Sequence, residues 1–506
     1  MSATAHASAL GAERTRAGLP RWWPLAALTL LAAVLRLPTL GLQSFWYDEA
    51  FTPVHVLHPS LWATLRSMVH TENSPPLWYL ISWLDARVLG TGEVALRLPS
   101  ALAGIATVPV AWGIGRELAG RRAAIACAAL VAVNPLFVWY SQEARVYALF
   151  ALTSALAMLC FLRAEREPSG ARMAAFAASG ALALLSHYFA VFLLIPMVLW
   201  LLAQRRCRRA AIPAAGALLL VGLALLPLIS AQGGHGTQWI GRWPLSQRLQ
   251  AIPQYFLTGA SGEPLGHGIE LLIALPILAG VGLGLWCVFG QPREAAEARQ
   301  IERAALIAAL LSVCGVLLPL VLVAFGADYL APRNLIGAMI PLTALIAVLV
   351  SAPAAGRAGT ALLVVMVLAL LAITVDVNLS PRLQRGNWRE LARLLRDAPA
   401  AHAVTTVELG AAPLEYYLPG LHNLARGATV MVSEIDETGY SPLRASAATA
   451  PAAGFHLLAR RNVNGLILYR FGSPVARPVT EAALRRHVIT LAHPEVLVGP
   501  ALAGSP

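Results

Sequence analysis

Long apolar stretches separated by short polar segments repeat along the first three quarters of the chain. With a window of about 19 residues, the length of a helix that crosses a bilayer, this pattern predicts about eleven transmembrane helices. The expected spans are 22–41, 98–115, 123–140, 146–162, 173–186, 188–203, 211–230, 269–290, 304–325, 335–350 and 359–377. The pattern therefore predicts an α-helical polytopic membrane protein.

One apolar segment, residues 74–90, does not fit a span. It is short, begins with two prolines and contains Asp85 and Arg87, so we interpret it as an amphipathic helix lying in the membrane interface.

The arginines support this choice. If the N-terminus is inside, the arginine-rich segments between spans fall on the cytoplasmic side, as the positive-inside bias requires. They contain Arg116, Arg121 and Arg122; Arg163, Arg166 and Arg172; Arg205, Arg206, Arg208 and Arg209; Arg293, Arg299 and Arg303; and Arg357. Counting 74–90 as a span would reverse the predicted side of the membrane for every later segment, against this bias.

Composition agrees with a membrane protein. Of 506 residues, 58% are hydrophobic and 13% charged, which is more apolar surface than one soluble core could bury. The net charge of +12 does not indicate a nucleic-acid partner, because the basic residues punctuate apolar spans instead of forming a patch on a soluble domain.

An odd number of spans sends the C-terminal region to the outer face. There, Asn387 is positioned to cap a short helix, and residues 403–407, 429–432 and 466–469 have the pattern of short strands. We expect a cytoplasmic tail (1–21), a membrane domain (22–377) whose first outer loop is 42–97, and a small extracytoplasmic α/β domain (378–506).

The same topology gathers the unusual polar residues at the outer ends of the spans. They include Asp48-Glu49, His70 to Asn73, Tyr140 to Arg145, His187-Tyr188, and Asp328 to Asn334. Guanidinium groups bind phosphate oxygens in a fork, and a carboxylate can deprotonate a hydroxyl. A lipid-phosphate-linked sugar is a natural substrate for this set. The chain has no glycine-rich phosphate loop, so we expect no nucleotide cofactor.

These residues carry a family resemblance. In order, the chain contains Phe45 to Ala50 (FWYDEA), Asn73 to Leu77 (NSPPL), Arg97 to Ser100 (RLPS), Asn134-Pro135, Tyr140 to Tyr147 (YSQEARVY), His187 to Phe189, and Tyr329 with Pro332-Arg333. Over about its first 350 residues, it resembles the GT-C superfamily of membrane glycosyltransferases, particularly bacterial enzymes similar to protein O-mannosyltransferases and the lipid A aminoarabinose transferase.

The resemblance implies a GT-C fold with two juxtamembrane helices in the first outer loop and an inverting transfer from a polyprenyl-phosphate sugar. It implies Asp48 as the general base and Glu49 as its partner or as a group that orients the acceptor. The expected donor-phosphate ligands are Arg145, Arg333, Tyr140 and Tyr329, and the expected substrate-pocket residues are Gln142, Glu143 and Tyr188. Some relatives bind a divalent metal near the phosphate, for which Glu72 and His187 are the candidate ligands here. Many relatives have Tyr where this chain has Asn334, and Tyr329 is a candidate for the missing aromatic contact.

Alternatives remain open at this level. A polyprenyl-linked glycan transporter or flippase would use the same lipid, although transporters place polar groups nearer the bilayer midplane. Arg145 could instead pair with Glu143 or anchor lipid headgroups, and Arg333 could anchor the membrane surface. Trp239 and Trp243 could form a mobile flap or a passive loop. The sugar is open, and the acceptor could be a protein, a lipid or a cell-wall glycan. The expected location is the cytoplasmic membrane, with the site outside.

Overall fold

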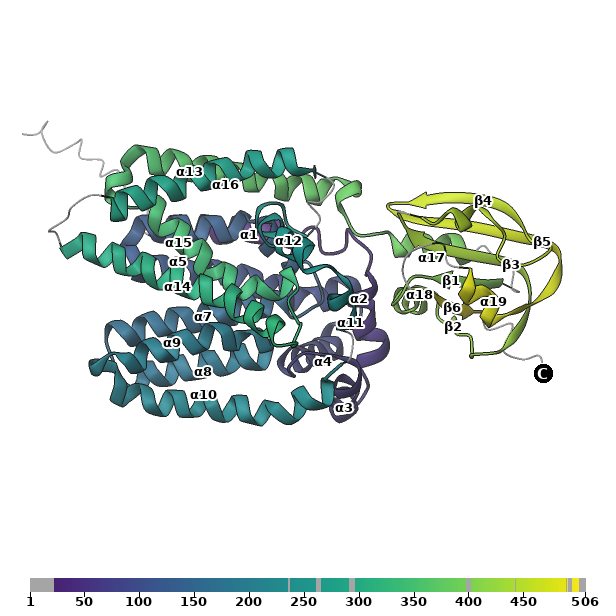
Figure 1. The fold of residues 1–506 in the computed structure, drawn as a ribbon, viewed down its shortest axis with the longest axis horizontal. Helices are drawn as coiled ribbons and strands as arrows, with labels where there is room; N and C mark the ends of the chain where they lie inside the picture. The colour runs from purple at the N-terminus through teal and green to yellow at the C-terminus, as the bar shows by residue number, and fades with distance from the viewer. Residues whose placement is uncertain are drawn as a thin grey trace, which may run out of the picture.

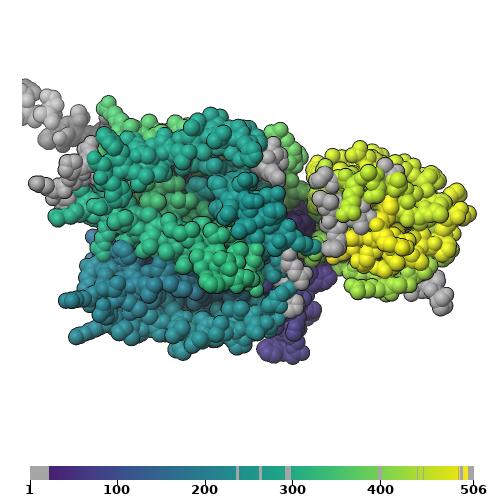
Figure 2. All heavy atoms as spheres, viewed as in Figure 1, coloured from purple at the N-terminus to yellow at the C-terminus, as the bar shows by residue number. Residues whose placement is uncertain are grey.

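The computed structural model describes residues 22–234, 237–260, 265–290, 296–396, 402–441, 443–487, 489 and 494–499. The expected tail, residues 1–21, lies outside this set. Figure 1 shows a body of roughly parallel helices with a sheet-containing lobe at one end. In the space-filling view, the first loop, in purple, lies at the junction between the helical body and the yellow lobe (Figure 2).

The helical body is built mainly from long apolar helices. They are α1 (Trp23–Arg36), α5 (Glu93–Val133), α7 (Tyr147–Arg166), α8 (Gly170–Ser186), α9 (Val191–Ala203), α10 (Arg205–Gln232), α13 (His267–Phe289), α14 (Ala296–Ala324), α15 (Ile336–Val350) and α16 (Gly356–Leu379). Within the described residues, seven helical segments are long and apolar enough to cross a membrane, and three shorter apolar segments correspond to α1, α8 and α9.

α5 is a pair of helices folded back on each other. Ala119 and Gly120 leave the helical conformation, and Gly120 has φ 79°, which glycine adopts without steric cost. The two halves of α5 and the nine other apolar helices correspond in position to the eleven spans that the sequence predicts; among the described residues, seven helices, α5 counted once, are long and apolar enough to cross a membrane. The expected span 123–140 is interrupted at Asn134, whose side chain accepts a hydrogen bond from the Leu136 N–H and so begins a new helix, α6 (Pro135–Ser141).

The first outer loop is mostly helical. It contains α2 (Tyr47–Phe51), a π-helical turn (Thr52–Val56), α3 (Leu61–Thr71) and α4 (Leu77–Leu89). α4 buries Trp78 and exposes 72% of Val88, as expected for a helix that packs on the bundle with one face and meets lipid with the other. The prediction of two juxtamembrane helices in this loop is confirmed by α3 and α4.

The lobe contains a mixed six-stranded sheet in the order β2-β6-β1-β3-β5-β4, in which β1 and β3 are parallel and the other neighbours antiparallel. The strands are β1 (His402–Thr406), β2 (His422–Asn423), β3 (Thr429–Tyr440), β4 (His456–Val463), β5 (Leu466–Thr480) and β6 (Glu495–Val498). α17 (Trp388–Arg396) and α18 (Ala411–Tyr417) cover one face of the sheet, and α19 (Glu481–Arg486) covers the other.

The three predicted strands correspond to β1 and to the starts of β3 and β5, whereas β2, β4 and β6 were not predicted. Asn387 caps α17 as expected, because its side chain accepts a hydrogen bond from the Glu390 N–H at 3.0 Å.

The hairpin within α5 gives a stability prediction. A Cβ on Gly115 would lie 2.4 Å from the Ala123 carbonyl oxygen, whereas a Cβ on Gly216 in α10 would meet nothing within 4 Å. Gly115→Val should therefore lower the free energy of unfolding by roughly 1–3 kcal/mol more than Gly216→Val, the usual cost of overpacking. Thermal unfolding of both variants in detergent measures the difference. Equal unfolding midpoints would contradict this close packing.

Candidate active site

α2 carries two adjacent acids that point to different partners. Neighbouring residues on a helix do not share a face, so Asp48 and Glu49 diverge at its first turn. Glu49 turns into the protein, where its carboxylate is fully buried. Asp48 turns toward Arg333, and its side chain keeps 14% of its surface exposed.

Glu49 forms a buried bidentate ion pair with Arg97 at the start of α5. The Arg97 guanidinium donates to both carboxylate oxygens at 2.7 and 2.6 Å, and the Ala144 N–H donates to one of them at 2.9 Å. Burial alone would raise the pKa of Glu49, but Arg97, Arg385 and these hydrogen bonds outweigh burial and lower it. Glu49 is therefore a carboxylate that fixes α2 against the bundle, and it does not line the cavity described below.

Asp48 pairs with the second predicted guanidinium. Arg333, in the turn Pro332–Leu335, donates to an Asp48 carboxylate oxygen at 2.6 Å. Its guanidinium also lies over the rings of Trp239 and Tyr147, 4.9 and 5.7 Å from their centroids. These contacts hold Arg333 beside Asp48.

Arg145 pairs with Glu72, not with Glu143. Its two terminal nitrogens donate to the two Glu72 carboxylate oxygens at 3.1 and 3.0 Å, and one of them also approaches the Asp48 backbone carbonyl at 3.3 Å. Glu72 follows α3, so this pair ties the juxtamembrane helix to the turn before α7. Both predicted guanidinium groups thus meet at Asp48.

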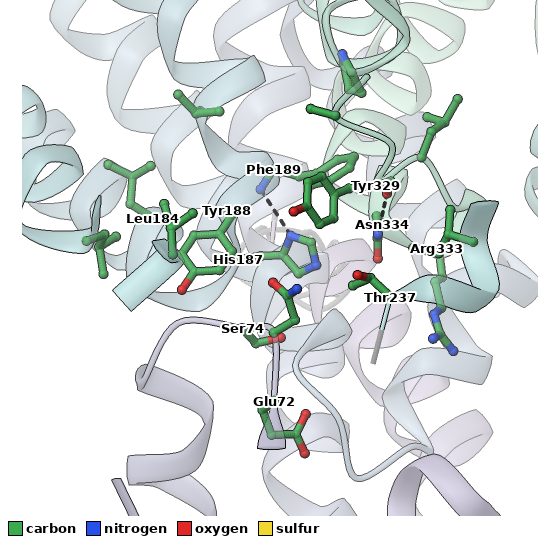
Figure 3. A pocket seen from close by; sticks show the side chains of 18 of the residues that line it. Glu72, Ser74, Leu184, His187, Tyr188, Phe189, Thr237, Tyr329, Arg333 and Asn334 are labelled. Carbon is green, nitrogen blue, oxygen red and sulfur yellow. Dashed lines mark hydrogen bonds between the residues drawn. The ribbon is translucent and has the colours of Figure 1, made fainter. Parts of the chain in front are cut away.

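A cavity of about 540 Å³ joins these groups to an apolar groove. Asp48, Glu72, Arg145 and Arg333 line its polar end, together with Asn73, Ser74, His187 and Asn334. Leucine, isoleucine, valine and phenylalanine side chains from α8, α9, α10 and α14 line the other end. Leu219 and Leu223 of α10 expose 63% and 50% of their surface, so the groove wall reaches the lateral face of the bundle. Figure 3 shows His187, Tyr329 and Asn334 gathered around this cavity, with Arg333 and Glu72 nearby.

The remaining predicted residues divide into two groups. Tyr329 and Tyr188 line the cavity, and the Tyr188 hydroxyl donates to the Gln232 side chain at 2.7 Å. Tyr140, Gln142 and Glu143 are buried behind it and do not line it. Their expected roles in donor and substrate binding stay predictions.

The three buried residues instead have structural contacts. Gln142 donates to the Leu35 carbonyl at 3.0 Å, which holds the end of α1. Tyr140 packs on Tyr147, with ring centroids 4.7 Å apart. Glu143 pairs with Arg385 at 2.5 Å.

The sequence reasoning assigned no role to three residues that contact this site, although two of them stand in the motifs that carry the family resemblance. Arg97 opens the RLPS motif directly before the expected span 98–115, and a charge at the edge of such a stretch is a signal that could have identified it. Tyr147, the last residue of the YSQEARVY motif, lines the cavity and contacts Arg333. Arg385 lies in the linker to the sheet domain, where no local pattern distinguishes it.

The donor set at Glu72 and His187 does not fit a divalent metal. Both Glu72 oxygens are bound by Arg145. His187 Nδ1 accepts the Phe189 N–H at 3.2 Å, so the neutral ring carries its proton on Nε2. In a metal-binding histidine, one ring nitrogen binds the metal and the other donates its N–H to a neighbour. Here Nδ1 is an acceptor and Nε2 is protonated, so this arrangement does not suit a metal ligand. Burial and the neighbouring Arg333 lower the pKa of His187 to about 3. Within the described ranges, no group of three or more His, Cys, Asp or Glu side chains could hold a metal ion.

Comparison with known proteins shows what the chain resembles. Residues 73–230 match the family model described as dolichyl-phosphate-mannose-protein mannosyltransferase. The structure is similar to that of ArnT from Cupriavidus metallidurans bound to undecaprenyl phosphate, with 13% identity, a TM-score of 0.52, and coverage of 89% of this chain and 98% of that chain. The apo structure of the same ArnT gives 13% identity and a TM-score of 0.51, covering 88% and 97%.

No curated protein sequence matches the chain. The structural likeness and the partial family match confirm the resemblance stated from the sequence. The chain has the GT-C fold of membrane glycosyltransferases, and the matched region runs from Asn73 almost to the end of α10.

The Glu49–Arg97 pair can be tested by stability. Glu49→Gln should lower the free energy of unfolding by about 3–5 kcal/mol, because it leaves a buried guanidinium without its counter-charge. Asp48→Asn should lower the free energy of unfolding by far less, because the pair of Asp48 with Arg333 is partly exposed. Because the pKa of Glu49 is lowered in the folded protein, its contribution is present above the unfolded pKa and disappears as the pH falls through the folded one. Urea unfolding at several pH values measures the free energy of unfolding of the wild type and both variants. Equal losses of stability for Glu49→Gln and Asp48→Asn would contradict the importance of the buried pair.

Proposed function

We propose that this protein is an integral membrane glycosyltransferase that moves a monosaccharide from a polyprenyl-phosphate donor to an acceptor hydroxyl. One observation carries the proposal: a carboxylate and two guanidinium groups converge at Asp48, at the polar end of an apolar groove. A polyprenyl chain fits the groove chemically, and a phosphodiester fits the guanidinium groups. The likeness in fold to ArnT, whose crystal structure holds undecaprenyl phosphate, supports this choice of carrier.

In this proposal, the donor phosphate competes with carboxylates for both arginines. Its oxygens bind Arg333 in place of Asp48 and bind Arg145 together with Glu72. Donor binding therefore releases the Asp48 carboxylate from its ion pair before the transfer. Asp48 then accepts the proton of the acceptor hydroxyl. The acceptor oxygen attacks the anomeric carbon, whose bond to the phosphate oxygen breaks with inversion. The polyprenyl phosphate leaves with that electron pair, and Arg145 and Arg333 stabilise its charge.

We further propose that the site faces the outside of the cytoplasmic membrane. Arginines at the opposite helix ends support this orientation: Arg163 and Arg166 bind Glu117, and Arg206 binds Glu165. Basic residues concentrate on the cytoplasmic side of membrane proteins.

The decisive experiment incubates the purified protein with a panel of polyprenyl-phosphate monosaccharides, with and without candidate acceptors. The proposal requires release of free polyprenyl phosphate from at least one donor, together with a glycosylated or hydrolysed product. A flippase would instead move intact donor between the leaflets of a liposome without cleaving it. That result would replace the proposed function.

Asp48→Asn should abolish transfer while donor binding is retained. The amide keeps the size of the side chain but cannot accept a proton, so the rate should fall by about 10²–10⁴-fold, the usual contribution of a general base. Because the amide competes less well for Arg333, the variant should bind the donor at least as tightly as the wild type. Single-turnover transfer and equilibrium binding of a labelled donor measure the two effects. Near-normal turnover would remove Asp48 from the mechanism.

Arg145→Gln should weaken donor binding by about 10–100-fold, the equivalent of roughly 1.5–3 kcal/mol for a charge-assisted contact. The double variant Arg145→Gln/Glu72→Gln avoids leaving Glu72 without a partner and should show the same weakened binding. Arg66→Gln, which removes a guanidinium that lies over the Trp62 ring of α3, serves as the matched control and should bind normally. Donor titrations compare the three, and wild-type affinity in both Arg145 variants would exclude Arg145 as a phosphate ligand.

A further inference from the structure

A second buried ion pair lies behind the cavity, at the junction with the sheet domain. Arg385, in the linker between α16 and α17, donates to Glu143 at 2.5 Å, and the two side chains expose 5% and 0% of their surface. The Arg385 guanidinium also lies over two indole rings, 4.0 Å from the centroid of Trp139 and 5.4 Å from that of Trp46. Neither Arg385 nor Glu143 lines the cavity, so the pair does not touch the proposed substrate there.

This pair connects three separate parts of the chain. Trp139 and Glu143 belong to α6 and the turn that follows it, and Arg385 belongs to the linker. Trp46 is the residue that begins α2: its carbonyl accepts the Glu49 and Ala50 N–H groups at 3.1 and 2.9 Å. A shift of Trp46 would therefore move the first turn of α2, which carries Asp48.

The linker also binds the segment just before α2. The Arg385 N–H donates to the Gln43 side chain at 3.0 Å, and the Trp388 N–H donates to the Ser44 hydroxyl at 3.0 Å. The ring of Trp46 packs against the apolar cluster around Trp388. The approach to α2 is thus held by the linker as well as by the helical bundle.

We infer that Arg385 is a positioning residue for the proposed transfer: through Glu143 and Trp46, it fixes α2 so that the Asp48 carboxylate faces the donor site. This inference rests on the proposed function and deepens it, because it makes the linker to the sheet domain part of the catalytic centre. Arg385 acts through its neighbours and does not contact the reacting atoms.

The charges around Glu143 make the pair sensitive to pH. Four charged groups act on Glu143 electrostatically: Arg385 from the linker, Glu49 and Asp48 from α2, and Arg333 from the turn before α15. Burial raises the pKa of Glu143 to about 7; Arg385 and Arg333 oppose this rise, and the two acids add to it. The ion pair is therefore complete above about pH 7 and weakens as Glu143 takes up a proton below that pH. Loss of Arg385 would raise the pKa of Glu143 further.

The test compares Arg385→Gln with the wild type in transfer assays across pH 5.5–9. We expect the maximal rate to fall by roughly 10–100-fold, the scale of a small misplacement of a catalytic group, while donor affinity stays unchanged because Arg145, Arg333 and the groove are intact. Because this variant no longer forms the ion pair, the acid limb attributed to Glu143 should disappear, as it should in Glu143→Gln. Arg385→Lys keeps the charge and should restore part of the rate. Arg382→Gln, in the same linker at a side chain that is 70% exposed, should match the wild type.

Glu143→Gln provides an independent variant that preserves shape if Arg385→Gln does not fold. It should lower the maximal rate and remove the acid limb attributed to Glu143. The inference is overturned if the Arg385→Gln protein has the wild-type rate and pH profile. If Arg385→Gln does not fold, the same result for Glu143→Gln overturns it. Either result leaves the proposed function standing. A wild-type protein that transfers no sugar from any donor would overturn the proposed function, and this inference with it.

Discussion

The buried pair of Glu49 and Arg97 is the interaction on which the rest of the site depends. Removing both charges from water is costly unless each is fully bonded, and here the guanidinium also donates to the Leu40, Gln43 and Ser44 carbonyls. Arg97 therefore provides hydrogen bonds both to carbonyl groups of the loop before α2 and to Glu49 in the first turn of α2. Because the pair fixes the rotation of α2, it also determines where the neighbouring Asp48 points. Two adjacent acids can thus have different tasks: one holds the helix and the other faces the cavity.

The cavity itself is balanced in charge. Each guanidinium at its polar end is matched by a carboxylate, Arg333 by Asp48 and Arg145 by Glu72. A phosphate that enters must displace or share these carboxylates, so an anion gains less from binding than it would at two unpaired arginines. This arrangement favours a ligand that can contribute a second source of affinity. A long apolar chain in the groove would supply it, since each buried CH₂ contributes about 0.8 kcal/mol.

The sequence predicted those features that depend on local composition. Hydropathy located the long apolar helices, and the short segment with Asp85 and Arg87 forms the separate helix α4 as expected, because these signals need no knowledge of tertiary contacts. The sheet was harder. β2 has two residues and β6 has four, too few to show an alternating pattern, and β4 was missed although Asn464-Gly465 forms the tight turn to β5, a dipeptide that favours such turns.

At the site, the residue types were predictable but the pairings were not. The predicted topology placed Asp48, Arg145 and Arg333 at the same end of the bundle, because it fixes which helix ends lie together. Which carboxylate meets which guanidinium depends on side-chain direction: Arg145 could have paired with Glu143, two residues away, but pairs with Glu72. Contacts such as Glu143 with Arg385 join positions 242 residues apart, and no periodicity in the chain connects them.

The loop before α2 connects the sheet domain closely to the helical body. Buried backbone groups need hydrogen-bond partners, and this loop obtains several from the C-terminal part of the chain. Arg389 donates to the Gly41 carbonyl at 3.2 Å, and the Tyr417 hydroxyl accepts the Phe45 N–H at 2.7 Å. Without those partners, the loop would have to rearrange to reach water, and the helix that follows it carries Asp48. The geometry of the acid therefore depends on the docking of a domain that lies more than 300 residues further along the chain.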